Sequence, residues 1–424
     1  MFRFLVKLSR ILVGSLFIIS GLIKANDALG FAYKLNDYFA ADVLDLPALI
    51  PFSYPLAVFI CIVEIILGVN TLIGSKMKIT SWSLLLMMVF FTWLTFYSAY
   101  YNKVTDCGCF GDAIKLTPWE SFWKDIILSF FVLIIFVGSY KPGIPFNTSK
   151  QQNYMLPISL ALLTLFSMLQ LEWAFPVWFT IVIFLVARFV GMMKSEAKVW
   201  LIAGVVALVS YGFTHYTYSH LPIKDYRPYK LRINIGEDMK LPEGAKQDVY
   251  EDIWKYDING EVKEFSTDDK PWSIEGAEFV DRKTILLQEG DKPPIHDFTI
   301  EGIGEDFTQR FLDMDYLVVI VAYDISKTNI EAQKGLDGFI DKAAKAGIMT
   351  IGLSASPEDK LEGFRRDINA MYSYFFTDET TLKTIVRANP GILLLKKGTI
   401  VGKWHHNDLP NFETLEEEII HWDN

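Results

Sequence analysis

Seven stretches of apolar residues, each close to the length of a membrane-spanning helix, dominate the first half of this 424-residue chain. A helix needs about 20 predominantly apolar residues to cross the hydrocarbon core of a bilayer. We therefore expect membrane spans at 5–23, 55–74, 80–100, 119–139, 155–171, 176–193 and 199–218. The connection between the fifth and sixth spans is very short, and the alternative there is a re-entrant turn. The pattern predicts a multi-pass helical membrane bundle.

Charge is distributed unevenly between the two halves of the chain. Residues 1–220 contain 15 Lys and Arg against 11 Asp and Glu, whereas residues 221–424 contain 25 against 39. The second half therefore reads as an acidic soluble domain. Nucleic acid is not an expected partner, because phosphate binding requires clustered cations.

Basic residues near the span ends predict the orientation of the bundle, because cytoplasmic loops are enriched in Lys and Arg. One side carries Arg3, Lys7, Arg10, Lys76, Lys78, Lys141, Lys150, Arg188, Lys194 and Lys198. The opposite side carries mainly Lys24, Lys34, Lys103, Lys115 and Lys124. We expect a cytoplasmic N-terminus that is retained as the first helix, since residues 1–21 lack a convincing cleavage site. In a diderm bacterium this chain would lie in the inner membrane, with its soluble domain in the periplasm.

Two of the three cysteines, Cys107 and Cys109, lie in a short loop between the third and fourth spans. Thiols one residue apart can exchange with another disulfide, and the neighbouring Gly108 and Gly111 allow a tight bend. A pair that only shapes a turn is one alternative. A soft-metal site for Cu(I) or Zn is another, although no His or Met cluster lies nearby to complete the shell. Redox exchange is the leading interpretation.

The third cysteine, Cys61, lies within the second span and three residues before Glu64, so both occupy one helix face. An ionisable residue inside a membrane span is a functional candidate. Cys61 could then serve as a resolving thiol, and Glu64 as a proton carrier or as the partner of Lys24. The simpler interpretation is that Cys61 fills apolar space and that Glu64 forms a salt bridge with Lys24.

Residues of the first four spans resemble the DoxX-like superfamily, and more closely its MauE branch of methylamine-utilisation membrane proteins. The resemblance rests on residues 17–24 with Asp27, on residues 64–68, and on the Cys-Gly-Cys-Phe-Gly sequence within 106–111. It implies a four-helix membrane domain over 1–140 and an association with disulfide maturation of a periplasmic enzyme. Three additional spans would follow over 141–220. DoxX-like relatives also suggest a quinone as electron acceptor, although no quinone motif is present in the sequence.

The soluble half is expected to contain two parts. Residues 221–297 are polar, with short alternating runs such as 231–235, which predict a small β-rich adaptor. In residues 298–424 apolar strands alternate with helices, as in βαβ units: strands near 315–323, 348–354 and 374–376, and helices near 328–346, 357–370 and 379–387.

The end of this α/β region, residues 388–404, resembles the terminal hairpin of a thioredoxin-like fold. Pro390, preceded by Asn389, matches the cis-proline of that family, where the loop contacts bound peptide. The chain departs from the family at residues 324–329, where the dithiol would stand and no cysteine occurs. The resemblance therefore implies a domain without dithiol chemistry of its own. Asn389 and Pro390 could still dock a partner near the membrane cysteines, or the domain could act only as a spacer.

These observations predict an integral membrane protein of thiol-disulfide exchange, acting on an extracytoplasmic thiol protein. Catalysis would start at Cys107 and Cys109, with Cys61 and Glu64 as further participants. The competing hypothesis is a non-enzymatic membrane scaffold, which would bind an assembly partner through the acidic domain.

Overall fold

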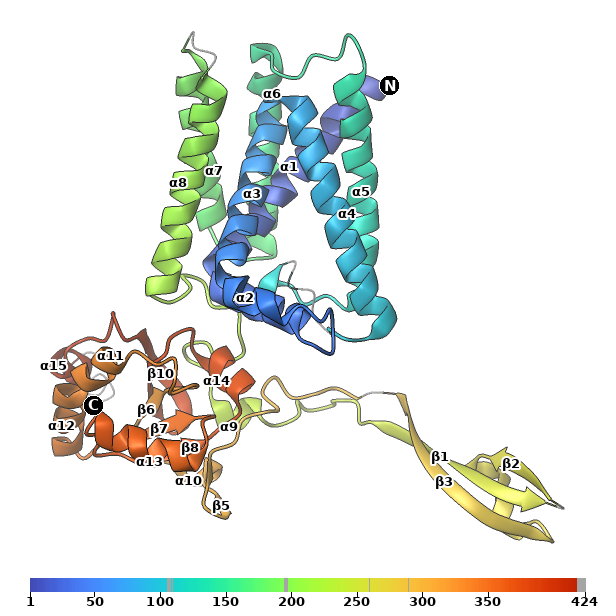
Figure 1. The fold of residues 1–424 in the computed structure, drawn as a ribbon, viewed down its shortest axis with the longest axis vertical. Helices are drawn as coiled ribbons and strands as arrows, with labels where there is room; N and C mark the ends of the chain where they lie inside the picture. Colours follow the sequence, from blue (N-terminus) through green and yellow to red (C-terminus); the bar gives the residue numbers. More distant parts are fainter. Residues whose placement is uncertain (105–107, 109, 194–196, 259, 289, 418–424) are drawn as a thin grey trace.

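The computed structural model describes residues 1–104, 108, 110–193, 197–258, 260–288 and 290–417, and seven long apolar helices in these residues form a bundle (Figure 1). They are α1 (Phe2–Asn26), α3 (Ser53–Ile73), α4 (Met77–Tyr101), α5 (Pro118–Tyr140), α6 (Ser149–Leu169), α7 (Phe175–Gly191) and α8 (Lys198–Ser219). Six of the predicted spans coincide with helices long and apolar enough to cross a membrane, and the remaining one, α7, has 17 residues. The predicted multi-pass membrane domain is therefore confirmed.

Helices α1 and α3 pack closely at the centre of the bundle because two glycines face each other. A Cβ atom on Gly68 would lie 2.8 Å from the carbonyl oxygen of Gly14, closer than side chains tolerate. Small residues of this kind allow two membrane helices to approach. Arg10, near the start of α1, is buried beside the C-terminal end of α3. Its guanidinium donates to the carbonyl oxygens of Thr71 and Leu72 at 2.9 and 3.0 Å. These bonds satisfy carbonyls that the end of α3 leaves without helical partners.

A helix that the apolar windows did not predict, α2 (Ala28–Phe39), follows α1 directly. Asp27 begins it, since its carboxylate accepts a hydrogen bond from the Gly30 N–H at 2.9 Å. The helix is amphipathic and lies across the end of the bundle that faces the soluble domain (Figure 1). Its polar face is therefore available to the soluble half.

The soluble domain is built on a seven-stranded sheet of order β10-β9-β6-β7-β8-β4-β5. Its strands are β4 (Glu301–Gly302), β5 (Glu305–Asp306), β6 (Leu317–Val321), β7 (Met349–Ser354), β8 (Tyr374–Phe376), β9 (Gly391–Lys396) and β10 (Thr399–His405). Strands β6, β7 and β8 are parallel, and β9 runs antiparallel to β6. The accompanying helices are α10 (Thr308–Leu312), α11 (Ile330–Gly335), α12 (Asp337–Lys345), α13 (Glu358–Asp367), α14 (Glu379–Ile385) and α15 (Phe412–Leu415). The expected α/β class is confirmed.

Residues 221–297, between the two domains, form two separate parts. One part lies against the seven-stranded sheet, and the other forms a separate arm. The alternating run 231–235, interpreted above as part of the β-rich adaptor, lies instead against β10, where the Ile400 N–H donates to the Ile233 carbonyl at 2.9 Å. The short helix α9 (Ile235–Asp238) follows it. The arm is an antiparallel sheet of order β2-β1-β3 that projects away from both domains (Figure 1). Its strands are β1 (Val249–Ile258), β2 (Glu261–Phe265) and β3 (Ala277–Gln288).

Candidate functional site

A buried ion pair joins α1 and α3 near the end of the bundle that faces the soluble domain. The Lys24 ammonium lies 2.8 and 2.9 Å from the two carboxylate oxygens of Glu64, and the side chains are only 4% and 2% exposed. Lys24 also donates to the Ser20 hydroxyl at 2.6 Å, and Ser20 donates to Glu64 at 3.1 Å. The salt bridge that the sequence allowed is therefore present. Its two charges compensate each other inside the bundle.

Cys61 lies on the same helix one turn before Glu64 and is completely buried. It packs in the apolar core that contains Ile65 and Leu22. It lines neither the cavity inside the bundle nor the cavity around Arg387 between the two domains. Within the described residues it is a buried thiol without a disulfide partner. Its proposed role as a resolving thiol therefore stays a prediction, since Cys107 and Cys109 lie outside the described residues.

Around Cys109 the structure describes Gly108 and the segment that begins at Phe110. Gly108 and Phe110 are buried, and residues 111–114 are half-buried. Gly108 has a φ of 66°, a left-handed conformation that favours glycine, and its α-carbon faces the Lys34 side chain of α2. The Phe110 ring is 7% exposed, and the Lys124 ammonium lies 5.3 Å from its centre. Gly108 and Phe110 therefore both lie against the membrane domain.

An apolar cavity of about 50 Å³ lies inside the membrane domain beneath Phe110. The Lys24–Glu64 pair borders it, and a second ion pair, Lys124–Asp125 at 2.7 Å, also lines it. Asp125 is 2% exposed and accepts a hydrogen bond from the Thr95 hydroxyl at 3.1 Å. A water molecule needs roughly 10–15 Å³ of such volume, so the cavity has room for a few waters bordered by four charged groups.

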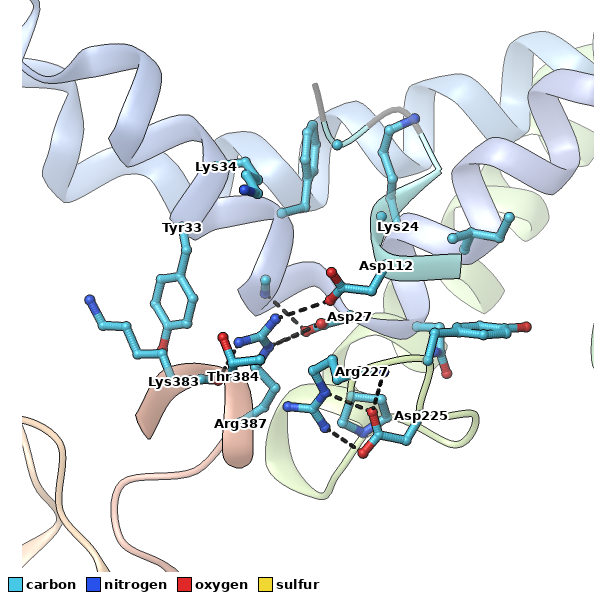
Figure 2. Close-up of a pocket in the computed structure, with 18 of the residues that line it drawn as sticks. Lys24, Asp27, Tyr33, Lys34, Asp112, Asp225, Arg227, Lys383, Thr384 and Arg387 are labelled. Atoms are coloured by element: carbon cyan, nitrogen blue, oxygen red, sulfur yellow. Dashed lines mark hydrogen bonds and ion pairs between the residues drawn. The ribbon is translucent and has the colours of Figure 1, made fainter. Parts of the chain in front are cut away.

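A second cavity, of about 180 Å³, lies between the membrane domain and the soluble domain (Figure 2). Arg387, at the exit of α14, crosses this boundary: its guanidinium lies 3.0 Å from both carboxylate oxygens of Asp27 and 3.6 Å from Asp112, which follows the cysteine loop. Arg387 is only 8% exposed. One soluble-domain cation thus holds the exit of α1 and the exit of the cysteine loop. Lys24 lines both cavities.

A second cluster of buried charges, formed by Arg227, Asp225 and Lys403, lies near Arg387 on the side of the soluble domain. Arg227 lies 2.7 Å from Asp225, and Lys403 of β10 lies 2.5 Å from the same carboxylate. Burial alone would raise the pKa of Asp225, but the neighbouring guanidinium and ammonium hold it below its ordinary value. Burial, followed by the nearby Arg227 charge, lowers the pKa of Lys403 to about 8. The carboxylate therefore stays ionised between its two cations.

The Asn389–Pro390 peptide bond is cis, as the sequence predicted for Pro390. The Asn389 amide donates to the carbonyl oxygen of Asp324 at 2.9 Å, so the thiol-free segment 324–329 closes against this loop. The face formed by the two segments is turned toward the protein's own membrane domain. The hydroxyl of Tyr33, from α2, donates to that of Tyr323 at 3.1 Å. A cavity of about 300 Å³ remains between this face and residues of α2 and α8.

Sequence reasoning did not identify Arg387, Asp125 and Asp112 as site residues, and it used Asp27 only for the family resemblance. The sequence singled out Glu64 because an intramembrane charge stands out, and the same signal could have identified Asp125, which lies within the fourth predicted span. For Arg387 no local signal exists. Within the described residues no group of three or more His, Cys, Asp and Glu side chains is arranged to hold a metal ion.

Comparison with known proteins gives a partial match at the membrane end of this site. Residues 3–138 match the family model described as methylamine utilisation protein MauE. The matched region contains the Lys24–Glu64 pair, the cysteine loop and almost all of α5. A stretch of 170 residues is 27% identical to Protein TlpB of Flavobacterium psychrophilum, covering 38% of this chain and 42% of that protein. The chain therefore spans less than half the length of this relative. No solved structure gives a significant match.

Proposed function

We propose that this membrane protein exchanges thiols and disulfides with an extracytoplasmic protein through Cys107 and Cys109. The observation that carries the proposal is the position of the loop's described residues. Gly108 and Phe110 are buried next to the intramembrane ion pair, and Asp112 is held by Arg387 of the soluble domain. The MauE match over this region supports the same assignment. The soluble domain, whose strand order and cis-proline support a thioredoxin-like fold, would then hold the loop in place from outside.

The exchange itself needs no further reactant. A thiolate of the loop attacks one sulfur of the substrate disulfide, that S–S bond breaks, and the second substrate sulfur leaves as a thiolate and is protonated. The other loop cysteine then attacks the mixed disulfide, which releases the reduced substrate and leaves the loop oxidised. The reverse sequence oxidises a substrate dithiol. We assign the proton transfers to Glu64 and Lys24, because the pair borders the cavity beneath Phe110.

The residues present do not fit a quinone at the intramembrane cavity. An engineered cavity of about 150 Å³ accommodates benzene, whereas this cavity measures about 50 Å³. A substituted quinone ring is larger than benzene, so we derive no step through it. Orientation in the membrane stays a proposal as well: the soluble domain lies at the end of the bundle opposite the N-terminus (Figure 1), which agrees with a periplasmic domain and a cytoplasmic N-terminus.

Trapping experiments test the proposal. In cells that express Cys107→Ser or Cys109→Ser, quenching with acid and alkylation should reveal mixed disulfides with partner proteins, and the double variant should reveal none. Cys61→Ser is the matched control and should leave exchange through the loop pair unchanged if Cys61 takes no part. Loop cysteines that stay in one redox state under both oxidising and reducing growth would refute exchange. Partner binding that survives the double variant would favour the scaffold function.

A further inference from the structure

The arm formed by β1, β2 and β3 is the part of the molecule that the proposed exchange does not use. It extends away from the membrane bundle and from the seven-stranded sheet, on the same side of the bundle as the soluble domain (Figure 1). Strands β1 and β3 pair from Val249↔Gln288 to Ile258↔Ala277, with register shifts after Val249 and after Lys255. Two 3-10 turns, Thr267–Asp269 and Pro271–Ser273, lie against β1 and β3. Most residues of the three strands are nevertheless exposed or half-buried.

One face of the arm carries a cluster of aromatic rings. The Trp254 ring lies 5.6 Å from that of Trp272 and 6.3 Å from that of Phe279, and Tyr256 lies 5.7 Å from Phe279. Trp272 and Phe279 are nevertheless 54% and 58% exposed. Aromatic side chains contribute the largest apolar areas to protein interfaces, and contiguous exposed apolar surface marks interaction sites.

Carboxylates outnumber cations in the arm that carries this aromatic cluster. Residues 249–288 contain 10 Asp and Glu against 5 Lys and Arg, so these 40 residues carry a net charge of −5, half of the net charge of −10 of the whole chain. Three of the five cations already pair within the arm, as Lys255–Glu264, Lys263–Glu261 and Arg282–Asp252. Glu278 and Asp281, next to Phe279 on β3, are exposed. They pair in register with Asp257 and Lys255, so they extend the acidic surface to the face opposite Trp254 and Tyr256. Arg282 lies on the aromatic face, 5.3 Å from the centre of the Trp254 ring. An apolar centre with a charged rim is the usual arrangement of a protein interface.

We propose that the arm is a docking surface for an extracytoplasmic protein that presents an apolar centre bordered by Lys and Arg. Charge complementarity selects this occupant, since the acidic rim attracts a basic surface and repels an acidic one. It also selects against the membrane, because lipid surfaces are commonly anionic and attract cationic segments. A second copy of the chain would bring the same excess of carboxylates to the contact. The inference is independent of thiol exchange, since it uses no residue of the cysteine loop.

A photoreactive phenylalanine analogue introduced at position 279 of the full-length protein, in its own membrane, tests the proposal. Illumination should give a discrete protein adduct, and sequencing of the crosslinked segment should show it to be basic. The double substitution Glu278→Lys with Asp281→Lys should lower the adduct yield by about tenfold, since it reduces the net charge of the arm from −5 to −1 and removes most of the attraction for a basic partner. The matched control Glu358→Lys with Asp359→Lys reverses two exposed carboxylates at the start of α13 and should leave the yield unchanged.

A second control places the same analogue at Phe376, which is 46% exposed on the soluble domain. An adduct yield at position 279 no higher than at position 376 would overturn the proposal. So would an adduct with lipid, an adduct with a second copy of this chain, or a yield insensitive to the charge reversal at positions 278 and 281. Trp272→Ala provides a variant that keeps every charge, and it should also weaken the adduct, because it removes part of the apolar centre.

Discussion

The Lys24–Glu64 pair yields the sharpest quantitative prediction. Both side chains are at least 96% buried and their charged atoms lie 2.8 Å apart. Removing one partner leaves a buried charge uncompensated, so Glu64→Leu or Lys24→Met alone should lower the free energy of unfolding by about 3–5 kcal/mol. The double substitution removes both charges and keeps apolar volume in place. It should return to within about 1 kcal/mol of the native protein.

Reversible unfolding of the protein in bicelles measures all four members of this double-substitution cycle. The expected coupling energy is at least about 5 kcal/mol, because two single losses of about 3 kcal/mol or more should nearly vanish in the double variant. The exposed pair Lys397–Asp315, with side chains 69% and 85% exposed, is the matched control. Lys397→Met should change stability by less than about 1 kcal/mol. Additive losses in the Lys24 and Glu64 variants would refute the reasoning. A stable double variant that still exchanges disulfides would refute the proton-transfer role alone.

Three further outcomes follow from other parts of the structure. Arg387→Gln should weaken docking of the soluble domain by about 2 kcal/mol, partly restored by Arg387→Lys, and faster hydrogen exchange in α2 and α14 would report it. Burial, followed by the neighbouring His406, lowers the pKa of His405 to about 4. The neutral form of His405 therefore stabilises the fold above about pH 6.5, and this contribution is lost as the pH falls toward 4. Thermal unfolding between pH 7 and 4 should show the loss, and His405→Gln should reduce it. Gly68→Ala should cost about 1–3 kcal/mol by forcing α1 and α3 apart, and unchanged stability would contradict the close approach at Gly14.

The sequence predicted the membrane bundle and the alternation of the soluble sheet because both depend on local patterns. Apolar length marks a span wherever it occurs, and the apolar runs near 315–323 and 348–354 mark buried strands. The amphipathic α2 was not predicted, since its 12 residues are shorter than a span and only partly apolar. Likewise, the run 231–235 alternates as a strand does, but whether it pairs within the arm or against β10 depends on tertiary contacts.

In the candidate site, too, the residues that have a local sequence signal were predicted and those that depend on tertiary contacts were not. Glu64 stood out because a carboxylate inside an apolar helix is costly, and Lys24 was the nearest cation at the same end of the bundle. By contrast, Arg387 lies 360 residues from Asp27 in the chain. Nothing in an acidic domain with 25 Lys and Arg in residues 221–424 distinguishes this arginine from the others. The contact between the two domains is a property of the folded arrangement.

Lys24 lines the interdomain cavity and also the cavity inside the bundle. On the proposed function, a proton that passes from the first cavity to Glu64 moves part of the way into the membrane electric field. A charge that crosses the whole field gains or loses about 2.3 kcal/mol per 100 mV. Moving a proton only as far as Glu64 would gain or lose a fraction of that energy. The thiol chemistry of the loop would then respond to the membrane potential, and energising or de-energising the membrane would shift the redox balance of Cys107 and Cys109.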